Sequence, residues 1–220
     1  MDMQINGHNV RSVLVVDDNP SVRETYAYAI EDLRLQPVYE DGPLESVGGA
    51  LTMLQRKADA LVCDYHLRKR NYSRFNGDDL VVESYKIGFP SILCTSYNDF
   101  EITLMRHKRR FIPALVKADD LSPEMIARAF TRCVDEHKGT FDPSRRPWRT
   151  LVRVEEVFPN DEYCYVVIPA WNTESKIRLL FKDLPVKLRR TAKAGMRLHA
   201  KVNIGAEKPE EVYFDAWEAA

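Results

Sequence analysis

The sequence has no apolar run that approaches the roughly 18 residues of a membrane span. Its first twelve residues, MDMQINGHNVRS, lack the apolar centre of a secretory signal peptide. The four cysteines form no CxxC pair, and Cys63 and Cys94 end apolar runs in which a thiol packs as a small hydrophobic side chain. We therefore expect a soluble, cytoplasmic protein whose cysteines are reduced.

The sequence also has no excess of either charge. The formal net charge of −1 over 220 residues argues against a wholly basic nucleic-acid binder. We find no internal repeat, no low-complexity tract and no helix-turn-helix pattern. With 45% apolar and 30% charged residues, the chain is long enough for one large or two small domains with ordinary cores.

Residues 1–137 alternate short apolar runs with amphipathic segments, which predicts strands separated by helices. Strands are expected at 13–16, 36–39, 61–63, 91–94 and 112–116. Helices are expected after the caps Asn19 and Ser122 and at 44–55, 79–86 and 100–109. This order predicts an α/β domain with a doubly wound, five-stranded parallel sheet and a site at the carboxyl ends of its strands.

Residues 138–147 contain glycine, two prolines and several charges, and they read as a linker. The remainder, 148–220, alternates in strand fashion. Strands are expected at 150–158, 162–168, 176–181, 197–203 and 211–217, with a short helix within 184–194. Five strands in so short a segment predict a small all-β barrel, either OB-like or SH3-like.

Carboxylates follow two of the expected strands. Asp17 and Asp18 come after the run 13–16, and Asp64 comes after the run 60–63. If these are neighbouring parallel strands, the three carboxylates converge and repel one another unless a divalent cation joins them. The pattern indicates a Mg²⁺-dependent phosphoryl-transfer site, although an Asp-Asp pair taken alone also suits the start of a helix.

Five separated elements of this region resemble the flavodoxin-like receiver domain of two-component response regulators. They are VLVVDD at 13–18, LVCDYHL at 61–67, NGDDL at 76–80, ILCTS at 92–96 and ALVKA at 114–118. Each element is short, but their order, spacing and strand context agree.

The resemblance implies that Asp64 is the phosphoacceptor and that Asp18 ligates Mg²⁺, with Asp17 assisting and the backbone carbonyl of His66 as a further ligand. It also implies roles for two other residues, Thr95 as the hydroxyl that binds the phosphoryl group and Lys117 as the ammonium that neutralises it. The implied phosphoryl donor is a histidine kinase or a phosphotransfer protein, with small acyl phosphates as substitutes.

The sequence departs from the family pattern in three places. Ala114 occupies the position of the usual switch aromatic, and Ala118 replaces the proline that usually follows the lysine. The connection from Asp64 to Gly77 is longer than usual and basic. Its cations are Arg68, Lys69, Arg70 and Arg74. We expect this connection to be a solvated insertion. The competing interpretation is a loop that places guanidinium groups near the phosphoryl group or meets an acidic or phosphorylated partner.

The second domain has nine basic residues and one acidic residue between Lys176 and Lys201. The candidate partner or nucleic-acid surface is Lys187, Arg189, Arg190, Lys193 and Arg197. With the aromatics Tyr163, Tyr165, Trp171 and Phe181, such a face would suit single-stranded nucleic acid. The interpretation that we favour is that the cations form a solvated face or pair with the acidic residues of 207–218, and that the aromatics pack inside the barrel. Protein docking is then the expected role of the domain.

We therefore expect a phosphorylation-dependent response regulator rather than an enzyme. A phosphohydrolase would need a second acid two residues after Asp64, where this chain has His66. Two further hypotheses are a scaffold that is never phosphorylated and a regulated single-strand binder. The surface of the fourth helix, fifth strand and fifth helix is expected to contact the second domain or the other copy in a homodimer. The cations at one end of it are Arg106, Lys108, Arg109 and Arg110.

Overall fold

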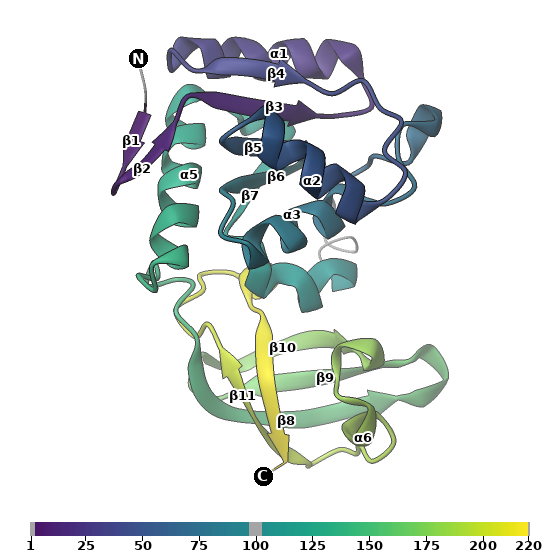
Figure 1. Ribbon diagram of the computed structural model, residues 1–220. Coiled ribbons are helices and arrows are strands. Elements are labelled where there is room, and N and C mark those ends of the chain that lie inside the picture. The colour runs from purple at the N-terminus through teal and green to yellow at the C-terminus, as the bar shows by residue number, and fades with distance from the viewer. Residues whose placement is uncertain (1–2, 97–102, 220) are drawn as a thin grey trace. The chain divides into compact units, whose positions relative to one another are not determined.

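The computed structural model describes residues 3–96 and 103–219, which divide into two units (Figure 1). Unit 1 holds the described residues up to 96 together with 111–141. Unit 2 holds 103–110 together with 142–219. The second unit is therefore discontinuous in sequence, because it includes a short segment from the first half of the chain.

Unit 1 contains the five-stranded parallel sheet that the sequence predicts. Its strands are β3 (Ser12–Val16), β4 (Gln36–Tyr39), β5 (Ala60–Asp64), β6 (Ser91–Thr95) and β7 (Ala114–Lys117). The strand order is β4-β3-β5-β6-β7, which is the flavodoxin-like order. The three central strands are almost wholly buried because helices cover both faces of the sheet, so they appear in the sequence as continuous apolar runs.

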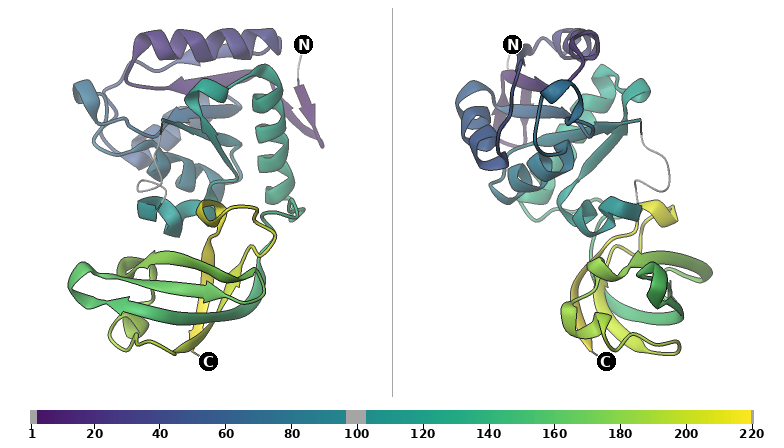
Figure 2. Two further views of the ribbon diagram at one scale, coloured as in Figure 1. Left: turned by 180° about the vertical axis from the view of Figure 1, so that it is seen from behind. Right: turned by 90° about the vertical axis from the view of Figure 1, so that its right-hand side faces the viewer.

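Four helices of the described residues cover this sheet, two on each face (Figure 2). Helices α1 (Pro20–Asp32) and α5 (Pro123–His137) contact each other on one face. Helices α2 (Val47–Lys57) and α3 (Gly77–Lys86) contact each other on the opposite face. The predicted caps are confirmed, since Asn19 accepts a hydrogen bond from the backbone N–H of Ser21 and Ser122 accepts one from that of Met125.

The sequence did not predict the hairpin at the start of unit 1. Strands β1 (Met3–Ile5) and β2 (His8–Val10) pair antiparallel, and their Ile5 and Val10 join the core beneath α1 and α5. Asn6 and Gly7 form the turn with φ of 47° and 81°. An Asn-Gly pair is the usual signal for such a turn, but the flanking strands are too short to show a period.

Two helices predicted within residues 1–137 have other bounds in the structure, and the described residues of the second belong to unit 2. Helix α2 starts at Val47 instead of residue 44, because the Ser46 side chain accepts from the backbone N–H of Gly49 and caps the helix there. Within the predicted helix 100–109, residues 97–102 lie outside the described residues. Residues 103–105 are α-helical, and Arg106–Phe111 continue as a 3₁₀ helix.

Unit 2 is an antiparallel five-stranded sheet. Its strands are β8 (Trp148–Phe158), β9 (Tyr163–Ile168), β10 (Asn172–Leu180), β11 (Arg197–Val202) and β12 (Phe214–Ala219). The order is β10-β9-β8-β11-β12, so β10 and β12 are its two edges. An all-β domain is confirmed, whereas closure into an OB-like or SH3-like barrel stays a prediction.

The short helix that the sequence predicts within 184–194 is confirmed. The segment 184–194 holds only α6 (Val186–Arg189), preceded by the 3₁₀ turn Phe181–Asp183. Leu184 and Leu188 turn inward and pack on the sheet's apolar core, which also contains Val154, Val166 and Leu179. Two buried leucines are enough to hold this segment against the sheet without a longer helix.

None of the helices in the described part of the chain has the length and apolar character that a membrane span requires.

Candidate acidic site of unit 1

The sheet register brings the predicted site residues to one edge. Asp17 directly follows β3, and Asp64 is the last residue of β5. These two strands pair, and Val16 of β3 lies beside Cys63 of β5. Thr95 and Lys117 are register partners at the ends of β6 and β7. Four neighbouring parallel strands therefore deliver their polar ends to the same side, which is where an open α/β sheet binds its ligands.

Backbone N–H groups orient two of the carboxylates. The backbone N–H of His66 donates to Asp64 Oδ2 at 2.7 Å, and that of Asn19 donates to Asp17 Oδ1 at 2.7 Å. Asp64 lies at the centre of the edge, on the middle strand of the sheet. Its carboxylate is thus held at a fixed angle by the turn that follows it.

The carboxylates destabilise one another's charge. Burial, together with the neighbouring charges of Asp64 and Asp18, raises the pKa of Asp17 to about 7 against the hydrogen bond from Asn19. Burial also raises the pKa of Asp64, opposed mainly by the hydrogen bond from His66. The cation Arg23 offsets this repulsion only in part. A cation placed among these carboxylates would relieve their repulsion.

Two buried oxygens of the site have no hydrogen-bond partner among the described residues: Asp18 Oδ2 and Thr95 Oγ1. A buried polar atom without a partner costs about 1–3 kcal/mol, so a ligand that supplied the partner would be stabilised. Asp18 Oδ2 suits a metal ion, and the Thr95 hydroxyl suits a phosphoryl oxygen. These orphaned atoms coincide with two of the roles that the resemblance implies.

The predicted Mg²⁺ ligands fit the ion's chemistry but do not form a complete cage. Within the described residues, no three His, Cys, Asp or Glu side chains are arranged to hold a metal by themselves. Mg²⁺ is usually bound by only one or two carboxylates and keeps several waters. Asp17, Asp18, Asp64 and the His66 carbonyl therefore remain the predicted ligand set.

The long connection after Asp64 is only in part the solvated insertion that we expected. Leu67, Tyr72 and Phe75 are buried, and Leu44 and Ser73 form a parallel bridge between this loop and the segment after β4. The apolar residues are spaced too irregularly among the cations to show this packing in the sequence. The prediction of a solvated loop was wrong for these three side chains, which fold back onto unit 1, whereas the cations at 68–70 and 74 are exposed.

Gly77 closes that loop against the site. A Cβ on Gly77 would lie 1.9 Å from the carbonyl oxygen of Asp64, and the backbone N–H of Gly77 donates to the Tyr65 carbonyl at 2.9 Å. Only glycine permits this approach. Sequence reasoning included Gly77 in the NGDDL element without assigning it a role.

The structure also places the two other departures from the family pattern. Ala114, at the position of the usual switch aromatic, is buried beneath the sheet's α5 face, and Lys117, which precedes Ala118, is exposed at the end of β7. The small Ala114 side chain leaves no ring to rotate behind Thr95. Among the described residues, cis geometry occurs at Gly42–Pro43 and not at Lys117–Ala118.

The candidate basic surface of unit 2 is only partly a free surface. Four of its residues, Lys187, Arg190, Lys193 and Arg197, are exposed, whereas Arg189 is half-buried. The half-buried Arg189 side chain is held in place, because its guanidinium donates to the carbonyls of Leu184 at 2.6 Å and Lys182 at 2.7 Å. Arg189 therefore stabilises the turn around α6.

The aromatic residues of unit 2 divide between the two faces of the sheet. Trp171 and Phe181 pack against the core, as predicted. Tyr163 and Tyr165 instead alternate with the buried Cys164 and Val166, and so face the opposite side. There they contact Phe158, with ring centroids 4.7 and 6.0 Å away. The prediction that all four aromatics lie inside the barrel was wrong for the two tyrosines.

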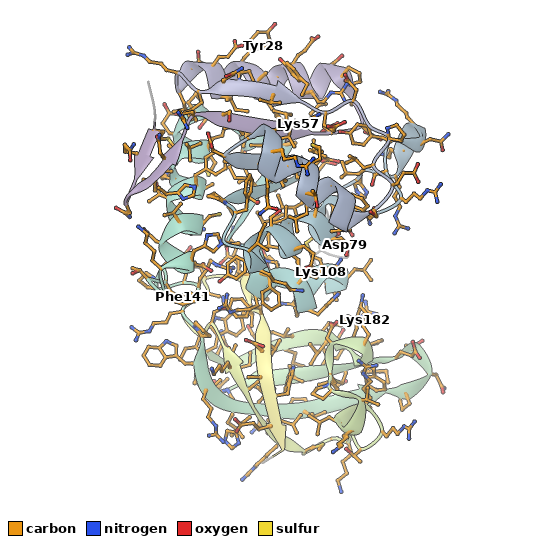
Figure 3. The ribbon with its side chains drawn as sticks, viewed as in Figure 1. Tyr28, Lys57, Asp79, Lys108, Phe141 and Lys182 are labelled. Atoms are coloured by element: carbon orange, nitrogen blue, oxygen red, sulfur yellow. The ribbon has the colours of Figure 1, made fainter. Side chains whose placement is uncertain are left out.

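The cations expected on an exposed end of the fourth helix are also partly buried. Arg106 and Arg109 are buried, and Arg106 is bound within unit 2. Lys182, labelled in Figure 3, donates to the Leu104 carbonyl at 3.0 Å, also within unit 2. These residues are structural in unit 2 rather than a free docking surface.

Solved structures resemble about three fifths of the chain. A response regulator receiver domain protein from Clostridium thermocellum is 16% identical, with 58% of this chain and 97% of that chain covered and a TM-score of 0.44. A sensor protein from Polaromonas sp. JS666 is 14% identical, with 58% and 98% covered and a TM-score of 0.45. A CheY-like receiver domain protein from Methanospirillum hungatei JF-1 is 16% identical, with 59% and 98% covered and a TM-score of 0.42.

No family model matches the sequence, and no curated protein is significantly similar to it. Two of these three structures carry the words receiver domain in their names. The similar structures cover the part of the chain that contains the parallel sheet. The fold of unit 1 is nonetheless defined by its own strand order.

Proposed function

We propose that the protein is a response regulator that accepts a phosphoryl group on Asp64 with Mg²⁺ and signals through unit 2. The observation that supports this most directly is the convergence of Asp17, Asp64, Thr95 and Lys117 at the ends of four parallel strands. A helix cap alone would explain the Asp-Asp pair, but not an acceptor carboxylate, a hydroxyl and an ammonium at the same edge.

In the proposed reaction, a carboxylate oxygen of Asp64 attacks the phosphorus of a phosphohistidine on a histidine kinase or phosphotransfer protein. The new P–O bond forms as the P–N bond breaks, and its electron pair stays on the donor imidazole. Lys117 binds a phosphoryl oxygen and neutralises the charge that develops there.

The metal would be held by Asp17, Asp18, Asp64 and the His66 carbonyl. When bound, Mg²⁺ supplies positive charge to the phosphoryl oxygens and removes the repulsion among the carboxylates. The raised pKa of Asp17 and the unpartnered Asp18 Oδ2 support a cation at this place.

Thr95 is the residue that we expect to sense the product. Its buried hydroxyl, which lacks a partner among the described residues, can donate to a phosphoryl oxygen once Asp64 is modified. Since no ring stands at Ala114, we expect the readout to begin with Thr95 itself. Unit 2 is the proposed output domain, with a protein as its partner.

The test is phosphorylation of the purified full-length protein with acetyl phosphate and Mg²⁺. Intact mass spectrometry should detect one added phosphoryl group on the wild type and none on Asp64→Asn. Asp79→Asn, in the first turn of α3, is a matched control that should be modified normally. If no donor modifies the wild type and beryllium fluoride does not bind, a scaffold that is never phosphorylated replaces this proposal.

The outward-facing Tyr163 and Tyr165 support a second candidate, a regulated single-strand binder. Arg178 Cζ lies 4.1 Å from the ring centroid of Tyr163, so a cation and stacked rings share this face. Binding of labelled oligonucleotides should then weaken steeply with salt and on Tyr165→Ala. A flat salt response would exclude this function and leave protein docking.

A further inference from the structure

The loop after Asp64 is held rigidly to the segment that follows β4. The backbone N–H of Leu44 donates to the Tyr72 carbonyl at 2.7 Å, and that of Arg74 donates to the Leu44 carbonyl at 3.2 Å. The Tyr72 hydroxyl donates to the Glu40 carbonyl at 2.7 Å. These bonds fix the loop on the β4 side of the acidic site.

Arg70 lies at the tip of this loop in an unusual backbone conformation. Arg70 and Asn71 have φ of 54° and 56°, in the left-handed region that residues with a Cβ seldom adopt. The buried Leu67 and Tyr72 flank them and hold the turn. The loop thus accepts local backbone strain while it presents the Arg70 side chain in one direction.

That direction is toward the acidic site. Arg70 Nη1 donates to the carbonyl oxygen of Asp18 at 3.3 Å. Arg70 and Asp18 line a cavity of about 350 Å³, together with Pro20, Arg23 and Tyr72. The cavity is open to solvent at the carboxyl end of β3, beside the predicted metal ligands.

The two arginines of the cavity differ in how many of their N–H donors remain available to a ligand. The buried Arg23 donates to the carbonyls of Asp17 at 3.0 Å and Glu40 at 2.9 Å, and to Asp41 Oδ1 at 2.9 Å. Arg70 is exposed, with one long hydrogen bond found for it. A guanidinium has five N–H donors, so most donors of Arg70 are available to a ligand.

The position of Arg70 complements that of Lys117. In the order β4-β3-β5-β6-β7, Asp64 ends the central strand and Lys117 ends the edge strand on one side. The loop bonds place Arg70 on the opposite side, next to β3 and β4. A phosphoryl group bound over Asp64 would therefore meet a cation from each side.

We propose that the guanidinium of Arg70 binds the oxygens of the phosphoryl group as it approaches Asp64. The inference rests on the proposed phosphoryl transfer and adds a second cation, supplied by the inserted loop, to the site. A planar guanidinium suits phosphoryl oxygens because it can donate two parallel hydrogen bonds. The ligand class is a phosphoryl group or its tetrahedral mimic.

The test compares beryllium fluoride binding and Mg²⁺ binding by calorimetry on the full-length protein. Arg70→Ala should weaken beryllium fluoride binding in saturating Mg²⁺ by about tenfold, since one charge-assisted contact is lost. The affinity for Mg²⁺ alone should stay within about twofold. Arg70→Lys should recover part of the loss. Arg68→Ala, which removes an exposed charge from the same loop outside the cavity, should bind as the wild type does.

Three outcomes would overturn the inference. Equal affinity of Arg70→Ala and the wild type for beryllium fluoride would show that the guanidinium does not bind the phosphoryl group. Equal losses in Arg70→Ala and Arg68→Ala would reduce the effect to general electrostatic attraction. A parallel loss of Mg²⁺ and beryllium fluoride affinity would mean that Arg70 only holds the loop in place.

Failure of the proposed function is recognised separately. In that case the wild type itself would bind no beryllium fluoride and accept no phosphoryl group from acetyl phosphate. A wild type that does both, with an unaffected Arg70→Ala, refutes the role of Arg70 alone.

Discussion

Arg106 Nη1 lies 2.6 Å from the carbonyl oxygen of Val212. The same atom donates to the Pro209 carbonyl at 2.8 Å, and the Arg106 side chain is buried. Burial lowers the pKa of Arg106 to about 10, although nearby Asp183 and Glu210 oppose the shift, so the group stays charged at neutral pH. All of these residues belong to unit 2.

Arg106→Ala should therefore destabilise unit 2 by about 2–3 kcal/mol, because two buried carbonyls lose a charged donor. Urea unfolding followed by tryptophan fluorescence measures this directly, since all three tryptophans (Trp148, Trp171 and Trp217) lie in unit 2. The exposed Lys187→Ala is the control and should change the midpoint little. An unchanged midpoint in Arg106→Ala would contradict the buried contact.

Gly77→Ala should destabilise unit 1 by about 3 kcal/mol or more, since its Cβ would lie 1.9 Å from the Asp64 carbonyl oxygen. The same change at Gly48, in the first turn of α2, meets nothing within 4 Å and should stabilise by up to about 1 kcal/mol. Far-ultraviolet circular dichroism during chemical unfolding compares the two. Similar midpoints for both variants would refute the close packing at Gly77.

Thr95→Val should leave the unmodified protein as stable as the wild type or stabilise it by up to about 1 kcal/mol, because the buried hydroxyl has no partner among the described residues. The same variant should bind beryllium fluoride more weakly, and Thr95→Ser should restore most of the affinity. Thermal unfolding with and without the ligand provides both readouts. A large loss of stability in the ligand-free variant would reveal a hydrogen bond in the ground state.

Asp17→Asn should stabilise the metal-free protein, and more at pH 8 than at pH 5. The folded pKa of Asp17, about 7, exceeds its ordinary value of 3.8, so the folded state binds more protons and loses stability as the pH rises through that interval. Asparagine does not titrate and keeps an oxygen for the Asn19 N–H. We expect a gain of about 1–2 kcal/mol at pH 8 after allowing for solvent screening.

The measurement is urea unfolding in EDTA at several pH values, with the exposed Asp120→Asn as control. A gain that is independent of pH would contradict the perturbed carboxyl.

The sequence predicts unit 1 well where burial acts on both faces of a strand. The runs at 13–16, 61–63 and 91–94 match β3, β5 and β6 within one or two residues, because a fully buried strand needs apolar side chains at every position. Once those strands are placed, the polar residues at their ends define the candidate acidic site.

Contacts between distant segments could not be predicted in this way. Arg106 stands among four cations, and such a run normally indicates a solvated surface. It is buried only because the carbonyls of Pro209 and Val212, about a hundred residues later, accept its hydrogen bonds. Likewise, the position of Arg70 depends on the pairing of Leu44 with Ser73, for which the sequence shows no period.

The discontinuity of unit 2 has a consequence for how the chain folds during synthesis. Residues 103–110 leave the ribosome well before the strands β8 to β12 with which they belong, whereas β7 and α5 follow them at once. Unit 1 can form its sheet before Val212 is available to the guanidinium of Arg106. Unit 2 becomes complete only after Val212 has been made, so a premature stop codon before Val212 would leave this segment without its partners.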